Sequence, residues 1–148
     1  MKTIRKQTTW SASILVLLVC TGTSRAFEPT NYNYRLKIEF TGYDKTETLT
    51  NFPALTIFSN GIENVEYGAS WDSRTDFAYT QFQAAATGGD LRFTDSSTTN
   101  ELNFEIEEWD TNDNSYVWVQ VPELVDSNTT IYAYWGNSSD TNLPSSTS

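Results

Sequence analysis

The sequence predicts an all-β fold, an antiparallel β-sandwich with a jelly-roll-like arrangement, from three observations. Apolar and polar residues alternate with a period of two in several short runs, which is typical of strands with one buried face. Stretches rich in Gly, Asn, Asp and Ser separate these runs at the spacing of an antiparallel sandwich. No long stretch keeps the 3.6-residue period of an amphipathic helix.

The N-terminal half of the domain contains two clear strand signals. Residues 34–40 alternate aromatic or aliphatic side chains with charged ones, as a half-buried strand does. Residues 55–58 form a second expected strand, which ends at the turn signal Asn60-Gly61. The segment 70–86 is either a loop or a loop with one helical turn.

The C-terminal half contains four more strand signals, at residues 91–93, 102–107, 116–121 and 131–135. In residues 116–121 the valines share one face, while Tyr116 and Trp118 lie on the other. If this strand paired with residues 131–135, these two rings and those of Tyr132 and Tyr134 would form one aromatic face. In total we expect six to eight strands.

Residues 1–26 have the pattern of a secretory signal peptide. A basic start is followed by an apolar stretch at residues 14–20, and small residues at Ser24 and Ala26 predict cleavage after Ala26. The apolar stretch is too short for a stable anchor across about 30 Å of bilayer. We therefore expect export to the periplasm, the cell surface or the medium, without membrane insertion after cleavage. The alternatives are an uncleaved N-terminal anchor and a lipoprotein modified at Cys20, which is less favoured because Val19 stands where a small residue is expected.

Charge and composition exclude several classes of function. Of nine Lys and Arg, four lie in the first 26 residues, so five remain against nineteen Asp and Glu, a net charge of −14. Such an anion repels nucleic acid and anionic lipid. The chain has no His, and its one Cys, Cys20, lies in the leader. Catalysis by Ser-His-Asp or Cys-His, thiolate or imidazole metal sites, and disulfides are therefore excluded from the mature domain.

The expected organisation is a signal peptide at residues 1–26, a β-sandwich at 27–137 and a tail at 138–148. The tail is rich in Ser and Thr and has one large apolar residue, Leu143, so it cannot form a core of its own. We interpret it as a linker or as the start of a truncated downstream region.

The mature chain resembles a known family in six blocks. Four of them lie in the C-terminal half, at residues 89–95, 102–110, 117–122 and 130–137, and two lie upstream, at residues 34–38 and in the L-x-x-F-P run at 49–53. Their order and spacing over residues 31–137 resemble the bacterial domain-of-unknown-function family 2341 (DUF2341). The sequence departs from the family pattern at Tyr32 or Tyr34, where the family often has Trp, and in a longer segment 61–80.

The resemblance implies an exported, multi-domain bacterial surface protein, with this domain often placed before a lectin-like sandwich of the laminin-G or concanavalin type. No catalytic residues are established for such domains, so none are transferred. Nine residues in the matching blocks are expected to form a structural motif: Asp90, Arg92, Phe93, Asp95, Glu105, Glu107, Trp118, Gly136 and Asn137.

Aromatic residues are the candidates for ligand binding. After residue 26 the chain keeps four Trp, eight Tyr and eight Phe. Exposed rings beside Asp, Asn and Gln suit a sugar, because a ring covers the apolar face of a pyranose and polar groups bind its hydroxyls. The four candidates are Trp71, Trp109, Trp118 and Tyr134. For Trp118 and Tyr134 burial in the core is the favoured interpretation, whereas exposure is given more weight for Trp71.

Three charged features are candidate sites. Glu105 and Glu107 would lie about 7 Å apart on one face of a strand, within the range of glycosidase carboxyl pairs, but a solvated strand face is the favoured interpretation. Arg92 could bind a ligand carboxylate, although a structural pair with Glu105 or Glu107 is favoured. The loop 110–114 offers oxygen ligands at calcium-like spacing. However, it lacks the Gly and the final Glu of an EF-hand, and Asn and Asp also suit a hairpin turn, so a turn is favoured over calcium binding.

These patterns leave three functions open. The first is a non-catalytic extracellular module that binds polysaccharide or assists a neighbouring lectin-like domain. The second is a purely structural spacer or adhesion domain of a surface protein. The third and most remote is a glycoside hydrolase that uses carboxylates. We expect no enzymatic activity.

Overall fold

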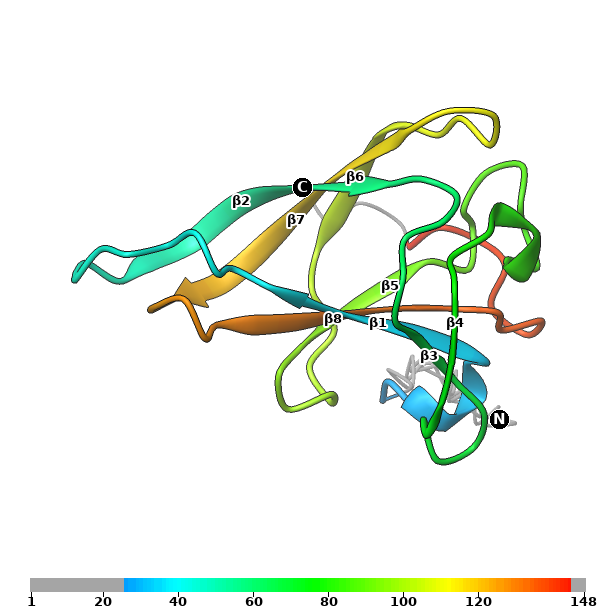
Figure 1. Ribbon diagram of the computed structural model, residues 1–148, viewed down its shortest axis with the longest axis horizontal. Helices are drawn as coiled ribbons and strands as arrows, with labels where there is room; N and C mark the ends of the chain where they lie inside the picture. Colours follow the sequence, from blue (N-terminus) through cyan, green and yellow to red (C-terminus); the bar gives the residue numbers. More distant parts are fainter. Residues whose placement is uncertain (1–25, 145–148) are drawn as a thin grey trace, which may run out of the picture.

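The described part of the chain, residues 26–144 of a computed structural model, is a sandwich of two antiparallel β-sheets (Figure 1). The larger sheet has five strands in the order β4-β3-β1-β8-β5, and the smaller has three in the order β2-β7-β6. In residues 26–144 the only helices are two single 3₁₀ turns, and none is long or apolar enough to span a membrane. The all-β sandwich prediction is confirmed. The predicted signal peptide, except Ala26, lies outside the described residues.

The eight strands are β1 (Tyr34–Glu39), β2 (Leu49–Phe58), β3 (Val65–Tyr67), β4 (Ser73–Thr75), β5 (Arg92–Asp95), β6 (Phe104–Glu108), β7 (Ser115–Leu124) and β8 (Thr130–Trp135). The two 3₁₀ turns are η1 (Pro29–Asn31) and η2 (Tyr79–Gln81). All six strands expected from the sequence are present. The strands β3 and β4 were missed, because three-residue strands are too short to display an alternating pattern.

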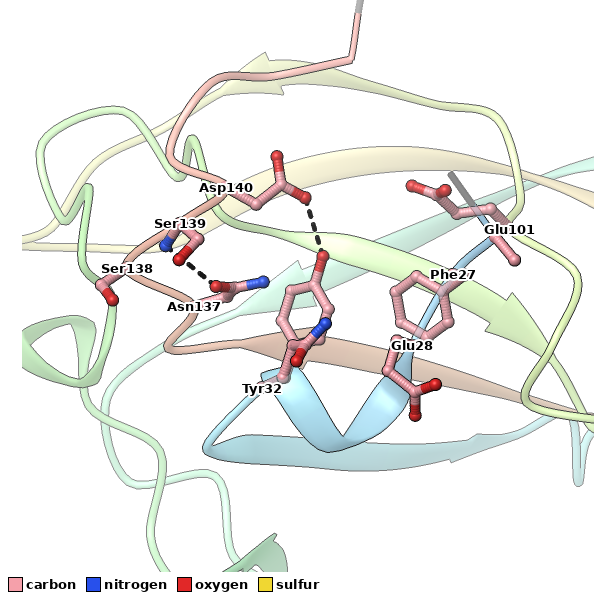
Figure 2. A pocket seen from close by; sticks show the side chains of 10 residues that line it. Phe27, Glu28, Tyr32, Glu101, Asn137, Ser138, Ser139 and Asp140 are labelled. Atoms are coloured by element: carbon pink, nitrogen blue, oxygen red, sulfur yellow. Dashed lines mark hydrogen bonds between the residues drawn. The ribbon is translucent and has the colours of Figure 1, made fainter. Parts of the chain in front are cut away.

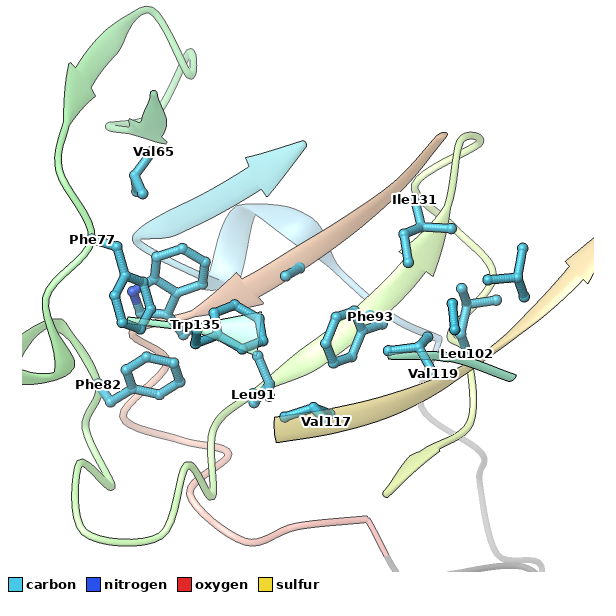
Figure 3. Close-up of a cluster of buried hydrophobic side chains, with 14 of the residues drawn as sticks. Val65, Phe77, Phe82, Leu91, Phe93, Leu102, Val117, Val119, Ile131 and Trp135 are labelled. Atoms are coloured by element: carbon cyan, nitrogen blue, oxygen red, sulfur yellow. The ribbon is translucent and has the colours of Figure 1, made fainter. Parts of the chain in front are cut away.

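The core lies between the sheets and is built by the alternation of each strand. In β1 the residues Tyr34, Leu36 and Ile38 pack against it, and in β7 the three valines 117, 119 and 121 are fully buried. Figure 3 shows side chains of both sheets meeting there, with Phe93 of β5 near Val119 of β7. With no disulfide available, this burial must hold the fold, at roughly 1.5–3 kcal/mol for each large apolar side chain.

The chain passes between the two sheets four times, between β1 and β2, β2 and β3, β5 and β6, and β7 and β8. The first and the last of these passages form two corners. The corners lie together, since the Phe40 amide donates to the Thr129 carbonyl (3.2 Å). Because β7 and β8 are in different sheets, the pairing that a single aromatic face would require does not occur. Tyr116 and Trp118 lie outside the smaller sheet, whereas Tyr132 and Tyr134 lie outside the larger one.

Asp90 and Gly136 fix the end of β8 to the loop before β5. The buried Asp90 carboxylate accepts hydrogen bonds from three backbone amides, those of Gln83 (3.1 Å), Ala84 (2.9 Å) and Gly136 (2.7 Å). Gly136 has φ +86°, and a Cβ there would lie 2.9 Å from the Tyr34 ring. Both residues therefore have structural roles, as expected for the motif.

Candidate functional site

The outer face of the smaller sheet exposes large apolar side chains. We call it the Trp118 face and define it by Leu55, Ile57, Asn103, Glu105, Glu107, Tyr116, Trp118 and Gln120. The exposed fractions are 42% for Leu55, 51% for Ile57 and 39% for Trp118. These residues face outward because their neighbours in each strand, such as Thr56 and Val117, are buried in the core. The period of two that builds the core thus also builds this face.

The pairing of the three strands brings these side chains into two adjacent rows. In one row Leu55 of β2 lies opposite Trp118 of β7, which lies opposite Glu105 of β6. In the other, Ile57 lies opposite Tyr116. Strands β2, β7 and β6 run side by side in Figure 1. The result is an apolar centre bordered on the β6 side by carboxylates.

Polar groups surround the indole of Trp118. Its Nε1–H donates a 2.6 Å hydrogen bond to the Glu107 carboxylate, and Glu105 lies directly across the strand pair. Farther along β7, the Asn103 amide donates to the Gln120 side-chain oxygen (3.0 Å). These bonds fix the ring and the amides in place while leaving the ring partly exposed. The sequence predicted the outward carboxylates correctly, but the prediction that Trp118 is a core residue is wrong.

The other three candidate rings do not join Trp118. Trp109 is half-buried against the core: its Nε1–H donates to the Ala85 carbonyl (2.8 Å), and its ring centre lies 5.1 Å from that of Phe82. A Cβ at Gly88, which has φ +64°, would lie 2.9 Å from this indole. Trp109 therefore closes one end of the sandwich and does not present a free ring.

Tyr134 is fully buried on the outer face of the larger sheet. The rings of Phe27, Tyr32 and Trp71 cover it, with centres at 5.1, 5.9 and 6.1 Å. Its hydroxyl makes no hydrogen bond among the described residues. Burial raises the pKa of this hydroxyl, and the nearby Thr94 and Arg35 offset only part of the effect. Burial was the favoured interpretation of Tyr134, although the residue lies outside the main core.

Trp71 is half-buried and lies over Arg35. Its ring centre is 4.9 Å from the Arg35 guanidinium carbon, and the Tyr132 ring lies 5.0 Å from the same carbon. Arg35 also pairs with Glu66, which binds Arg74 as well (2.9 Å). The backbone of Trp71 is in the left-handed region, with φ +55°. The ring therefore stabilises a cation of the same chain.

Arg92 is a buried structural cation, with 4% of its side chain exposed. Its guanidinium binds the carboxylate of Asp140, lies 3.4 Å from that of Glu101, and donates to three backbone carbonyls. The sequence favoured this structural role, but the predicted partners, Glu105 and Glu107, are wrong. They lie on the outer face of the smaller sheet, whereas Arg92 belongs to the larger one. Asp140 lies after β8 and is 48 residues away from Arg92 in the sequence, so no local sequence pattern indicates the pair.

Beside Arg92 lies a hollow of about 390 Å³ between the N-terminal segment and residues 137–140 (Figure 2). Its lining includes Phe27, Glu28, Tyr32, Glu101 and Asp140. The Tyr32 hydroxyl donates to Asp140 (2.9 Å), and burial together with this carboxylate raises its pKa. Burial also raises the pKa of Glu101, although Arg92 opposes the effect. The sequence gave no signal for the hollow, because its walls come from three distant segments.

The remaining motif residues support turns and the core. Phe93 is fully buried. Hydrogen bonds from Ser97 and Asn100 outweigh burial and lower the pKa of Asp95, which closes the turn after β5. The Asn137 side chain accepts the Ser139 amide (2.9 Å). Residues at the start of the expected linker contact the sandwich, since the backbone carbonyl of Asn142 accepts a hydrogen bond from the Arg92 guanidinium (2.7 Å).

The loop considered for calcium uses its carboxylates in its own turns. Asp110 accepts the Asn112 amide (2.8 Å), and Asp113 accepts the Asn114 amide (2.9 Å). Among residues 26–144 no three or more Asp, Glu, His or Cys side chains gather as metal ligands would. The loop has the hydrogen bonds of an ordinary Asx turn.

Comparison with protein families gives one match. Residues 87–148 match the model described as Domain of unknown function (DUF2341). The match covers all four C-terminal blocks of the resemblance, from 89–95 to 130–137, whereas the two upstream blocks precede it. Comparisons with curated proteins and with solved structures found no match. Residues 87–148 therefore match a family whose function is unknown.

Proposed function

We propose that the protein is a non-catalytic module of a secreted or cell-surface protein that binds polysaccharide on the Trp118 face. One observation carries the proposal: Trp118 is 39% exposed at the centre of a sheet face. Leu55 and Ile57 are exposed beside it, and a contiguous exposed apolar patch, unlike a single exposed ring, marks an interaction site.

The arrangement around the ring favours a sugar over other occupants. Leu55 and Ile57 extend the apolar area beside the indole, and Asn103, Gln120 and the carboxylates provide hydrogen-bonding groups at its border. A pyranose has the same division, with an apolar face and a rim of hydroxyls. An open sheet face also suits a long polysaccharide chain, since such a chain can extend past the edge of the sheet.

The position of the carboxylates supports binding without hydrolysis. A glycosidase needs two carboxyl groups on opposite sides of the bond to be cleaved. Glu105 and Glu107 instead project from one strand on one exposed face. In the hollow, Asp140 is already bound by Arg92 and Tyr32. The net charge of −14 after the leader continues to favour partners other than nucleic acid or anionic membranes.

Affinity electrophoresis of the purified protein in gels containing a panel of neutral and charged polysaccharides tests the proposal. We expect retardation by at least one polysaccharide, and a loss of affinity of about tenfold or more, about 1.4 kcal/mol, in Trp118→Ala. Tyr67→Ala is the matched control, because Tyr67 has the same exposed fraction, 39%, but lies on the larger sheet. No retardation across the panel would favour the spacer function, and equal losses in both variants would exclude the Trp118 face.

A further inference from the structure

We infer that the Trp118 face selects glycans with free amino groups over neutral ones and rejects glycans with carboxylates or sulfates, and that Glu105 is the specificity-determining side chain. This inference rests on the proposed function and names the substrate class of the same site. It comes from the unequal distribution of charge between the two sheets.

The three strands of the smaller sheet contain no Lys or Arg. The strand β6 alone contributes three Glu, at 105, 107 and 108. Of the five cations after the leader, four lie in strands of the larger sheet: Arg35, Lys37, Arg74 and Arg92. A ligand on the Trp118 face therefore meets carboxylates without a compensating cation from the strands beneath it.

The carboxylates are close enough to the ring to act on a stacked sugar. Glu107 touches the indole through its hydrogen bond, and Glu105 is the direct cross-strand neighbour of Trp118. Directly opposed side chains in antiparallel strands have Cβ atoms about 4.5–5.5 Å apart. A substituent on a sugar that covers the indole thus lies within reach of Glu105.

An ammonium group on that sugar would gain two interactions that a hydroxyl or an N-acetyl group lacks. The first is the charge attraction of Glu105, which remains free to bind because the indole hydrogen bond uses Glu107. The second is the attraction of a cation to the face of the indole ring. A uronate or sulfate would instead be repelled by Glu105 and by the net charge of the domain.

The test compares oligomers of glucosamine, the same oligomers N-acetylated, and a polyuronate, by calorimetry at about pH 5.5. At this pH sugar amines carry charge. We expect binding of the amino oligomer to be at least about tenfold tighter than that of the acetylated one, and no binding of the polyuronate. Raising the salt to about 1 M, where the Debye length is about 3 Å, should reduce the preference.

Glu105→Gln should lower the preference for the amino oligomer over the acetylated one at least about fivefold, because the amide can still hydrogen-bond a sugar hydroxyl but no longer attracts an ammonium group. Glu39→Gln is the control, because it makes the same charge change on β1 of the larger sheet. Equal effects of the two variants would mean that net charge, and not Glu105, causes the preference. Equal or tighter binding of the acetylated oligomer or the polyuronate would overturn the inference but leave the proposed function intact. If no glycan bound, the proposed function itself would fail.

Discussion

The two sheets share one core but use their outer faces differently. Outside the larger sheet, aligned residues form a row across the strands, with Arg74, Glu66, Arg35, Tyr134 and Arg92 in register. Members of this row are paired with charges or covered by rings of the same chain. Outside the smaller sheet, Leu55, Ile57 and Trp118 are left uncovered. One outer face is thus occupied by the protein itself, and the other is available to a partner.

The difference teaches that exposure cannot be inferred from residue type. Tyr134 and Trp118 each lie on the outward side of a central strand, yet Tyr134 is fully buried and Trp118 is 39% exposed. The cause is the N-terminal segment, which folds over β8 and places Phe27 and Tyr32 on Tyr134. No described segment crosses the Trp118 face in the same way. The four predictions below test this contrast, from the largest expected effect to the smallest.

The two tryptophans associated with the smaller sheet should differ most in their effect on stability. Trp109→Ala should lower the free energy of unfolding by about 3–5 kcal/mol, because it leaves a cavity beside Phe82 and an unpaired Ala85 carbonyl. Trp118→Ala should lower it by less than about 1 kcal/mol, because its ring already contacts water. Urea denaturation of both variants measures the difference. A large loss in Trp118→Ala would mean that the face serves the fold.

Arg92→Met should lower the free energy of unfolding by about 2–4 kcal/mol. The substitution leaves the Asp140 and Glu101 carboxylates and three backbone carbonyls without their donor. Arg74→Met is the control and should cost less than about 1 kcal/mol, because its side chain is 48% exposed. If glycan binding fell while the melting temperature of Arg92→Met stayed unchanged, Arg92 would be a ligand-binding residue instead.

Removal of the Tyr79 hydroxyl and removal of the Tyr134 hydroxyl should have opposite effects on stability. The Tyr79 hydroxyl lies within hydrogen-bonding distance of the Phe58 carbonyl (2.9 Å) and the Ser115 hydroxyl (2.8 Å), so Tyr79→Phe should cost about 1–2 kcal/mol. The Tyr134 hydroxyl is buried without a partner among the described residues, so Tyr134→Phe should be neutral or stabilising by up to about 1 kcal/mol. Thermal unfolding checks both. A destabilised Tyr134→Phe would indicate a buried water on that hydroxyl.

Glu101→Gln should give the smallest effect and raise the free energy of unfolding by a few tenths of a kcal/mol at pH 7. Burial raises the pKa of Glu101, so the charged form is disfavoured in the folded state. That cost is present at pH 7, disappears as the pH falls through the folded pKa, and is absent below the ordinary pKa of about 4.3. The gain is small because 42% of the side chain is exposed and water screens it. Urea denaturation at pH 7 and about pH 3.5 measures it; a loss at pH 7 would show that the pair with Arg92 outweighs burial.

Much of the fold could be predicted because its strands are long enough to display their period. The alternation in β1 and β7 predicted both the strands and their buried faces, including the three valines of β7. The same alternation placed Glu105 and Glu107 outward. It failed for β3 and β4, whose position depends on the pairing of Glu66 with Arg35 and Arg74 across three strands. The family resemblance was confirmed over residues 87–148.

The sequence by itself determined the all-β class, the absence of imidazole from the whole chain, and which side chains of each long strand share a face. Only the tertiary structure decided which of those faces is covered. It assigned β7 and β8 to different sheets, so Trp118 and Tyr134 ended on opposite sides of the molecule. The physical reason is that alternation is a local property of consecutive side chains, whereas burial depends on distant segments such as residues 27–32 and 137–142 that the pattern of a strand does not encode.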